Sequence, residues 1–224
     1  EEIARTYGYD RFSDDPGPAR PTTVPDHPVF QLEDRLRVVL SQEGLLEATN
    51  PAFASASEGN VEIDNPISLE ENYLRARLLP ALLRNVGYNF ARGSRDVRLF
   101  EIGTVFHQAD VGEPPREDLH VAVAVTGRQR PSHWSQEGTL LDFWDLRGIL
   151  DAILAASGWN NPSLSAEGED ESLFDGSMHV SVANEDGMAI GSAGRVESHR
   201  IDSPAWAGDV WGVELRLPMD PTMD

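Results

Sequence analysis

Arginines are concentrated in one stretch of this chain. Residues 72–98 hold six of them with Asp96 as the single acidic residue, in a chain whose formal charge is −20. A guanidinium offers a planar fork of donors that matches carboxylates and phosphates. The cluster is therefore either a contact surface for an acidic partner or a solvated helix face balanced by acidic neighbours in the fold. The interface candidates are Arg75, Arg77, Arg84, Arg92 and Arg95.

The other chemically active residue types form no catalytic pattern. The six histidines make no HxH or HExxH pair and stand beside no nucleophile in a recognisable motif, so each is expected to be structural or exposed. The chain has no cysteine, which excludes disulfides, thiolate catalysis and cysteine-ligated zinc. All 18 basic residues are arginine, so lysine chemistry is also excluded. The histidines are at positions 27, 107, 120, 133, 179 and 199.

Composition limits the class of protein. With 224 residues the chain can form one large domain or two small ones, and no apolar run approaches the ~20 residues that would span a membrane. The charge of −20 repels a phosphate backbone, which argues against a main nucleic-acid surface. The chain starts at Glu1 without methionine, so we expect it to be a piece of a longer protein. The lack of cysteine is compatible with the cytosol.

Hydrophobic spacing predicts the elements that must position these residues. Helices are expected over 29–43, from near Leu78 to Gly93, and over 142–157. The second helix begins late because a helix from Ser68 would place Pro80 in its interior, where proline costs ~3 kcal/mol. A short helical turn capped by Ser68 and Glu71 remains possible. Strands are expected over 45–54, 98–107, 119–126, 178–183, 188–190 and 211–217, with a hairpin at 184–187 and an acidic loop at 160–172.

These elements predict an α+β fold, in which an antiparallel β-sheet is flanked by helices. There is no regular strand–helix–strand alternation of the kind that forms a doubly wound sheet. Five prolines between positions 16 and 28 indicate an extended linker. We therefore divide the chain into the tail of a preceding module (1–12), a Pro-rich linker (13–28), a core domain (29–218) and the start of a further linker (219–224).

The segment 65–106 contains, in this order, Asn65-Pro66-Ile67-Ser68, Leu74-Arg75, Leu78-Leu79-Pro80, Leu82-Leu83, Asn89, Leu99 to Gly103, and Val105-Phe106. In these motifs it resembles the β subunit of bacterial phenylalanyl-tRNA synthetase. A second similarity is 142–148, Asp-Phe-Trp-Asp-Leu-Arg-Gly, where the family has Asp-Phe-Phe-Asp-Leu-Lys-Gly. No single physical requirement dictates a match of this length and order, so the resemblance is specific.

The resemblance implies a class II aminoacyl-tRNA synthetase-like domain that is catalytically degenerate. Active members hold the ATP phosphates with one arginine in a strand-loop-strand motif and another at a glycine-rich strand-to-helix junction. Arg98 and Glu101 give a superficial likeness to the first motif. The second, Gly-x-Gly-x-Gly-x-x-Arg, is missing, and Gly194-Arg195 has the wrong spacing. We therefore assign no catalytic residue and expect the fragment alone to be inactive.

The resemblance also implies partners and cofactors. In the family, α and β subunits form an α2β2 heterotetramer that joins phenylalanine to tRNA(Phe) with ATP and Mg, and the α subunit holds the active site. This domain would pack on α in the cytoplasm, with no membrane contact, and the arginines would contact α or tRNA. Glu1 and Glu2 match the last acidic positions of a family magnesium motif, although acidic residues also stabilise a helix N-terminus. No cofactor is expected on the fragment.

Two other functions remain open. The chain could be an active class II-type adenylate-forming ligase, which would bind ATP by itself. It could also be an independent tRNA-binding module, which would bind tRNA tightly and with strong salt dependence. The missing glycine–arginine motif argues against the first, and the acidic charge argues against the second.

Overall fold

A computed structural model gives the structure of the chain. It describes residues 2–12, 26–110, 112–130, 133–135, 138–166, 173–219 and 221. Most of the predicted linker (13–28) and of the final segment (219–224) lies outside the described residues, as does 167–172 of the predicted acidic loop. Within the described part of the chain, no helix is long and apolar enough to cross a membrane.

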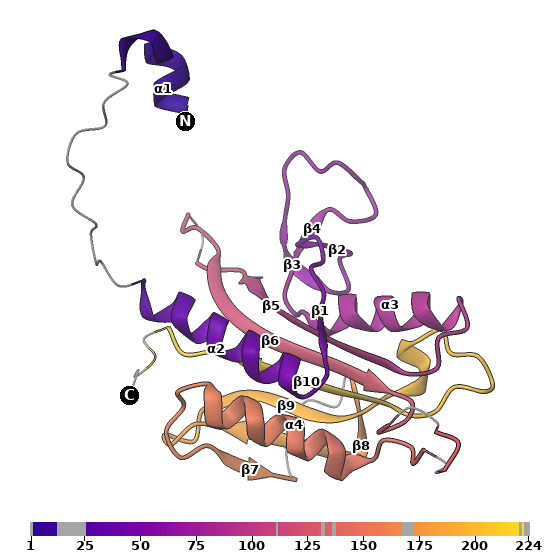
Figure 1. Cartoon of the computed structure of the whole chain (residues 1–224). Coiled ribbons are helices and arrows are strands. Elements are labelled where there is room, and N and C mark those ends of the chain that lie inside the picture. Colours follow the sequence, from indigo (N-terminus) through magenta and orange to yellow (C-terminus); the bar gives the residue numbers. More distant parts are fainter. Residues whose placement is uncertain are drawn as a thin grey trace.

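A seven-stranded sheet forms the centre of the molecule (Figure 1), in the order β1-β5-β6-β10-β9-β8-β7. Every neighbouring pair is antiparallel except β1 and β5, which are parallel. The predicted α+β fold with an antiparallel sheet is confirmed, with one parallel pair at its edge. The strands are β1 (Leu46–Glu47), β5 (Val97–His107), β6 (Arg116–Thr126), β7 (Ser163–Ser165), β8 (Phe174–Ala183), β9 (Ala189–Val196) and β10 (Val210–Arg216).

Three long helices pack on this sheet: α2 (Pro28–Gln42), α3 (Leu79–Phe90) and α4 (Phe143–Ala156). All three were predicted, and Pro80 lies in the first turn of α3, where its missing N–H costs little. A capping box starts α4, because Asp142 and Asp145 each accept a hydrogen bond from the other's backbone N–H. The short helices are α1 (Glu2–Tyr7), η1 (Tyr9–Arg11) and η2 (Ser198–Arg200).

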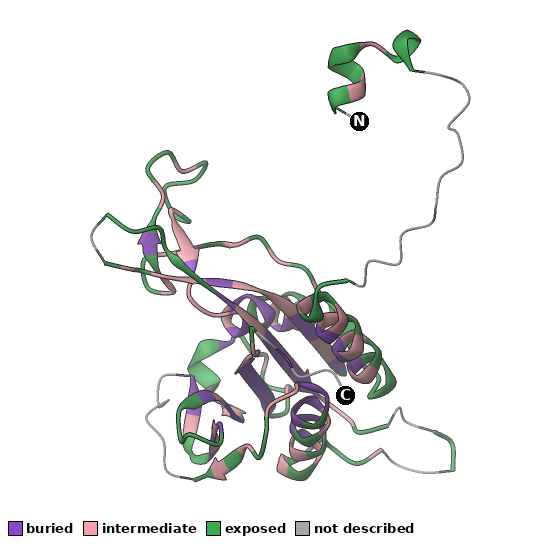
Figure 2. Cartoon of the chain, turned by 90° about the vertical axis from the view of Figure 1, so that its left-hand side faces the viewer, coloured by how far each residue is buried: buried purple, intermediate pink, exposed green. Residues whose placement is uncertain are grey.

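The helices cover opposite faces of the sheet. On one face α2 and α4 lie side by side, and their leucines and isoleucines pack against Phe100, Val123 and Val213. On the other face α3 packs against Ala122 and Ala124. Burial is therefore greatest in the middle strands, coloured purple in Figure 2, while the outer sides of the helices remain exposed. The side chains on the α3 face of the sheet form the candidate site.

The predicted strand 45–54 is wrong in extent. It is divided between β1 in the large sheet and β2 (Phe53–Ala54) in a separate antiparallel sheet. This small sheet has the strand order β2-β4-β3, in which β3 is Gly59–Glu62 and β4 is Tyr73–Arg75. Pro51 has no N–H for a ladder and restricts the residue before it, so one strand cannot run through this position.

Three further expectations needed correction. The possible helical turn at 68–71 is absent, because Ser68 Oγ instead accepts a hydrogen bond from Glu70 N in a local turn. The predicted hairpin at 184–187 is present, but its strands β8 and β9 extend further than the apolar pattern indicated. The small strand β7 lies within the segment predicted as an acidic loop.

Candidate functional site on the sheet

Two carboxylates lie in one row across the α3 face of the sheet. Ala122 of β6 is paired with Glu101 of β5 on one side and with Glu214 of β10 on the other. Paired residues of neighbouring strands point to the same face, so both side chains project toward α3. Both are buried, with exposures of 2% for Glu101 and 3% for Glu214. Buried carboxylates need partners, and each of these has several.

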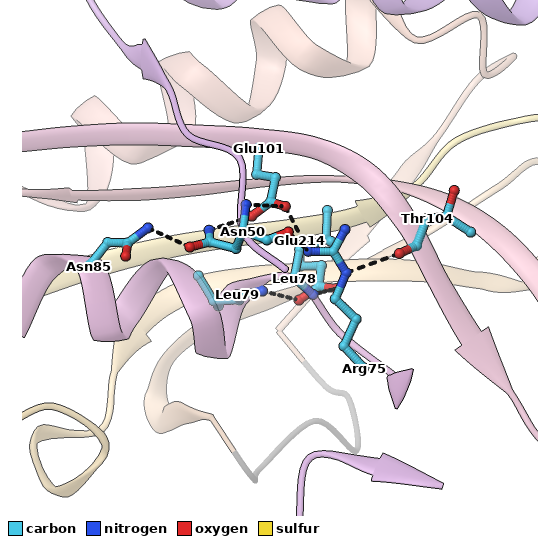
Figure 3. Close-up of polar contacts among 8 residues, drawn as sticks. All are labelled: Asn50, Arg75, Leu78, Leu79, Asn85, Glu101, Thr104 and Glu214. Atoms are coloured by element: carbon cyan, nitrogen blue, oxygen red, sulfur yellow. Dashed lines mark hydrogen bonds and ion pairs between the residues drawn. The ribbon is translucent and has the colours of Figure 1, made fainter. Parts of the chain in front are cut away.

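Glu101 is held by Arg75 and Asn50 (Figure 3). Arg75 Nη1 lies 2.7 Å from Glu101 Oε1, and Asn50 Nδ2 lies 2.7 Å from Glu101 Oε2. Arg75 also donates from Nε to the carbonyl of Thr104 at 3.0 Å. Asn85 Nδ2, on α3, donates to Asn50 Oδ1 at 2.9 Å. This network joins the turn after β1, the end of β4, the strand β5 and the helix α3.

Glu214 caps helix α3 from the sheet. Leu78, at the helix N-cap, supplies no side-chain cap of its own. Instead Glu214 Oε1 accepts from Leu78 N at 2.9 Å, and Oε2 accepts from Leu79 N at 3.0 Å. The carboxylate also contacts His120 Nδ1 at 3.0 Å and forms an ion pair with Arg77 Nε at 3.5 Å. A carboxylate on a helix N-terminus satisfies free N–H groups and opposes the positive end of the helix dipole.

These contacts set the protonation of Glu214. Burial alone would raise its pKa, because desolvation disfavours the charged form. The hydrogen bond with His120, the charge of Arg77 and the N–H of Leu78 outweigh burial and hold the pKa of Glu214 below its ordinary value. The pKa of the neighbouring His107 is lowered by burial and by the charge of Arg116. Glu214 is therefore an ionised anchor at neutral pH.

Glycine allows the close approach between the sheet and the segment above it. A Cβ on Gly103 would lie 2.5 Å from Arg75 Nη2. A Cβ on Gly212 would lie 3.0 Å and 3.2 Å from the two methyl groups of Leu79. Glu101 and Glu214 thus lie directly beneath Arg75 and the first turn of α3. Their carboxylate oxygens accept hydrogen bonds from these internal groups.

The two arginines that resembled phosphate-binding arginines have other partners. Arg98 donates from Nη2 to the carbonyls of Arg128 at 3.1 Å and Gln129 at 2.7 Å. It is three residues from Glu101 on one strand, so the two side chains point to opposite faces. Arg195 pairs with Asp175 and, at 3.6 Å, with Asp209. The likeness of Arg98 and Glu101 to a nucleotide-binding motif is therefore confined to the sequence.

The predicted interface arginines separate into internal and surface groups. Arg75 is 7% exposed and its guanidinium is bonded to internal groups, while its assignment as an interface residue stays a prediction. Arg77 pairs with Glu214, and Arg84 pairs with Glu58 at 2.6 Å. Arg92 lies 3.2 Å above the ring of Tyr88, and Arg95 lies 5.0 Å from the ring of Trp206. The five arginines of the sequence cluster therefore differ both in burial and in the acidic or aromatic partner that each contacts.

The predicted magnesium ligands are not brought together with other acids in the described part of the chain. Glu1 lies outside it. Glu2 begins the short helix α1 and pairs with Arg5. The described residues hold no group of three or more His, Cys, Asp or Glu side chains that could bind a metal ion. They do not by themselves fit Mg²⁺, which prefers several oxygen ligands, so the assignment of Glu1 and Glu2 stays a prediction.

Sequence reasoning missed three residues of this site: Asn50, His120 and Glu214. Glu214 gave a usable signal, since it is a charged residue between Val213 and Leu215 in a predominantly apolar strand. Such a residue needs a buried partner. His120 contacts that carboxylate, in line with the expectation that the histidines are structural. His179 is also buried, although its ring nitrogens have no hydrogen-bond partner among the described residues.

The fold is that of a class II aminoacyl-tRNA synthetase. Two solved structures of the pyrrolysyl tRNA synthetase of Desulfitobacterium hafniense resemble the chain. One has a TM-score of 0.62 at 16% identity, and the other has a TM-score of 0.59 at 18% identity. Both likenesses cover 87% of this chain and 68% of the synthetase chain. At this identity the similarity establishes the fold only.

The chain belongs to the family described as phenylalanyl tRNA synthetase beta chain CLM domain, whose model matches residues 17–217. The phenylalanine--tRNA ligase beta subunit of Xanthomonas euvesicatoria is 40% identical over 168 residues, covering 70% of this chain and 21% of that protein. Its counterpart in Xanthomonas campestris is 35% identical over 229 residues, which cover 97% of this chain and 28% of that protein. The chain therefore spans about a quarter of the length of the curated relatives that it matches.

Proposed function

We propose that this chain is the non-catalytic synthetase-like domain of a phenylalanyl-tRNA synthetase β subunit. It packs on a catalytic α subunit in a cytoplasmic α2β2 enzyme that joins phenylalanine to tRNA(Phe). ATP and Mg serve the α subunit in this proposal, and this domain contributes to assembly. Residues 29–218 form the core of the domain, preceded by a module tail and a linker. Family membership supports the proposal, but the chain matches only part of each relative.

The contacts of the two buried carboxylates support the proposal that the domain is non-catalytic. Glu101 and Glu214 are the charged groups of the central row. Glu101 holds Arg75 in place, and Glu214 holds the start of helix α3. Nucleotide activation needs positive groups directed at transferring phosphates. Arg98 is directed at backbone carbonyls instead. The network is thus suited to holding the fold together.

The proposed contact with α is the outer side of α2 and the adjoining edge strand β1. Phe30, Val38 and Leu46 are each more than half exposed there. On α2, Phe30, Asp34, Val38 and Ser41 follow helical spacing and are all exposed, so they form one stripe. Beside it, β1 is the end strand of the sheet and can pair with a further strand. Apolar side chains at a free sheet edge are suited to a stable protein contact.

The surface arginines remain proposed contacts at the rim of an interface with α or tRNA. Arg92 and Arg95 are the best placed of the five original candidates, because each stacks on an aromatic ring and neither has an acidic partner among the described residues. Rim charges act mainly on association rate and salt dependence.

Co-purification with the α subunit of the same organism tests the proposal. The wild-type chain should form a complex by size-exclusion chromatography and should support no phenylalanine-dependent ATP–pyrophosphate exchange without α. Val38→Asp and Leu46→Asp should each weaken the complex by about 30-fold or more, the size of an interface hot spot. Met188→Asp is the matched control, since Met188 is also exposed but directly precedes β9, which lies four strands away from β1 in the sheet.

Other outcomes would favour other functions. Exchange by the chain alone would identify an active adenylate-forming ligase. Tight tRNA binding that falls steeply with salt would identify an independent tRNA-binding module. A wild-type chain that neither binds α nor exchanges would place the assembly surface elsewhere in the β subunit.

A further inference from the structure

A concave region lies between the small sheet and the first turns of α3. It is a pocket of about 400 Å³, open to solvent. Its walls come from the β2–β3 connection, from the segment leading into α3, from α3 itself and from η2 after β9. Pockets of 300–1,000 Å³ are of the size that holds small organic ligands.

The floor of this pocket is apolar. Pro80 and Leu83 lie three positions apart on α3, so they are neighbours on one face of the helix. Leu173, which directly precedes β8, and Ala76 complete the floor. Leu83 and Leu173 are largely buried, and the surrounding sheet and helix fix them in place. The floor is suited to the flat face of a ring or a short aliphatic chain.

Three arginines line the same pocket: Arg77, Arg84 and Arg200. Glu58, also in the lining, pairs with Arg84, and Glu214 pairs with Arg77. Arg200 is exposed and forms no ion pair with any residue of the described part of the chain. The pocket is therefore locally positive in a chain of charge −20.

The positive charge of the pocket comes from the arginine guanidinium groups and not from the N-terminus of helix α3. The first backbone N–H groups of the helix, those of Leu78 and Leu79, already donate to Glu214, and Pro80 has none. An anion entering the pocket would thus meet side chains that offer planar, charge-assisted hydrogen bonds.

We propose that this pocket binds a small organic anion, with one carboxylate or phosphate group attached to an apolar body about the size of a phenyl ring. The anionic group pairs with Arg200 at the rim, next to Arg84, and the body lies on Pro80, Leu83 and Leu173. Such a site is independent of the proposed assembly with α.

Nuclear magnetic resonance titration of the 224-residue chain, without any partner, tests this site. The probes are 3-phenylpropanoate, phenyl phosphate and inorganic phosphate. The organic probes should shift the backbone amide signals of Gly59, Ala76 and Arg200 in a saturable way. A dissociation constant of about 1 mM is the affinity that a ligand of this size reaches at ordinary ligand efficiency. The organic probe that binds more tightly identifies the preferred anionic group.

Three variants assign the shifts to the pocket. Arg200→Gln should weaken binding about tenfold, because it removes one charge-assisted hydrogen bond. Ser57→Trp should abolish it by filling the pocket from an exposed position. Arg92→Gln removes a positive charge from the turn that follows α3, outside the pocket lining, and should leave the affinity unchanged.

Three results would overturn the site. These are an affinity equal in all variants, shifts that do not saturate, and inorganic phosphate binding as tightly as phenyl phosphate. None of them bears on assembly, because no α subunit is present in the titration. Failure of this inference is therefore distinguishable from failure of the proposed function.

Discussion

The interior beneath α3 and the outer surface of the same helix contain arginines from one short stretch of sequence. Beneath the helix, Arg75 is buried and bonded to a buried carboxylate. On the surface, Arg84 pairs with Glu58 while about half of its side chain remains in solvent, and Arg92 stacks on Tyr88. The residue type is the same, but the solvent exposure and the partner differ.

This difference shows that burial determines the effect of losing each arginine. A surface ion pair contributes ~0–1 kcal/mol, since water screens the attraction and the side chains lose freedom. Removing one member of a buried pair costs ~3–5 kcal/mol, because it leaves the other charge without water and without its partner. The two regions should therefore respond very differently to the same substitution.

Replacing Arg75 should have the largest effect. Arg75→Ala leaves Glu101 buried without its cation and should lower the free energy of unfolding by ~3–5 kcal/mol. Urea denaturation followed by circular dichroism measures this loss. Arg92→Ala, in the exposed turn that follows α3, is the matched control.

A double variant sharpens this prediction. In Arg75→Met with Glu101→Gln, no unpaired charge remains, so the combined loss should be smaller than the sum of the single losses by ~1–3 kcal/mol. Strict additivity of the two losses would show that Arg75 and Glu101 are not coupled as their 2.7 Å contact indicates.

Glu214 should give the next largest effect, with a specific pH dependence. Glu214→Gln should cost ~2–3 kcal/mol at pH 7, because two backbone N–H groups and Arg77 lose a charged acceptor. Its pKa is lower in the folded chain than in the unfolded chain, where it is ~4.3. Between these two pKa values the unfolded state binds the extra proton, so stability falls as pH falls.

The difference in stability between wild type and Glu214→Gln should therefore be fully present above about pH 4.3 and shrink below it. Parallel urea denaturations at pH 7 and pH 3.5 measure this change. An equal difference at both pH values would mean that the ionised carboxylate does not hold the helix.

The smallest effect is expected at Arg84. Arg84→Ala removes a half-exposed ion pair with Glu58 and should cost at most ~1 kcal/mol, with the loss reduced further at high salt. Thermal denaturation at low and high ionic strength is the measurement. A loss as large as that of Arg75→Ala would mean that burial does not separate the two regions.

The sequence was sufficient for elements with strong local patterns. The three long helices followed from 3.6-residue spacing, and the start of α3 followed from the steric limits of Pro80. Strands β5, β6 and β10 followed from apolar runs with alternation. The division of 45–54 was missed although Pro51 gave a local signal for it, since proline has no N–H for a strand ladder.

The site depended on contacts that no local pattern contains. Leu78 and Glu214 are 136 positions apart, and they meet only because β10 lies beside β6 in a defined register. The placement of Arg75 in the interior likewise required β4 to end above Gly103. A local count of charges therefore identified the arginines but could not divide them into internal and surface groups.

The position of β10 has a consequence for how the chain folds during synthesis. It is the last strand of the sheet to leave the ribosome, and it pairs with β6 on one side and β9 on the other. The β5–β6 and β8–β9 hairpins can form early from neighbouring residues, but each then has an unpaired edge at the future centre of the sheet. Until Val210–Arg216 is made, these edges can pair with other chains, so a nascent chain arrested before that strand is prone to aggregate.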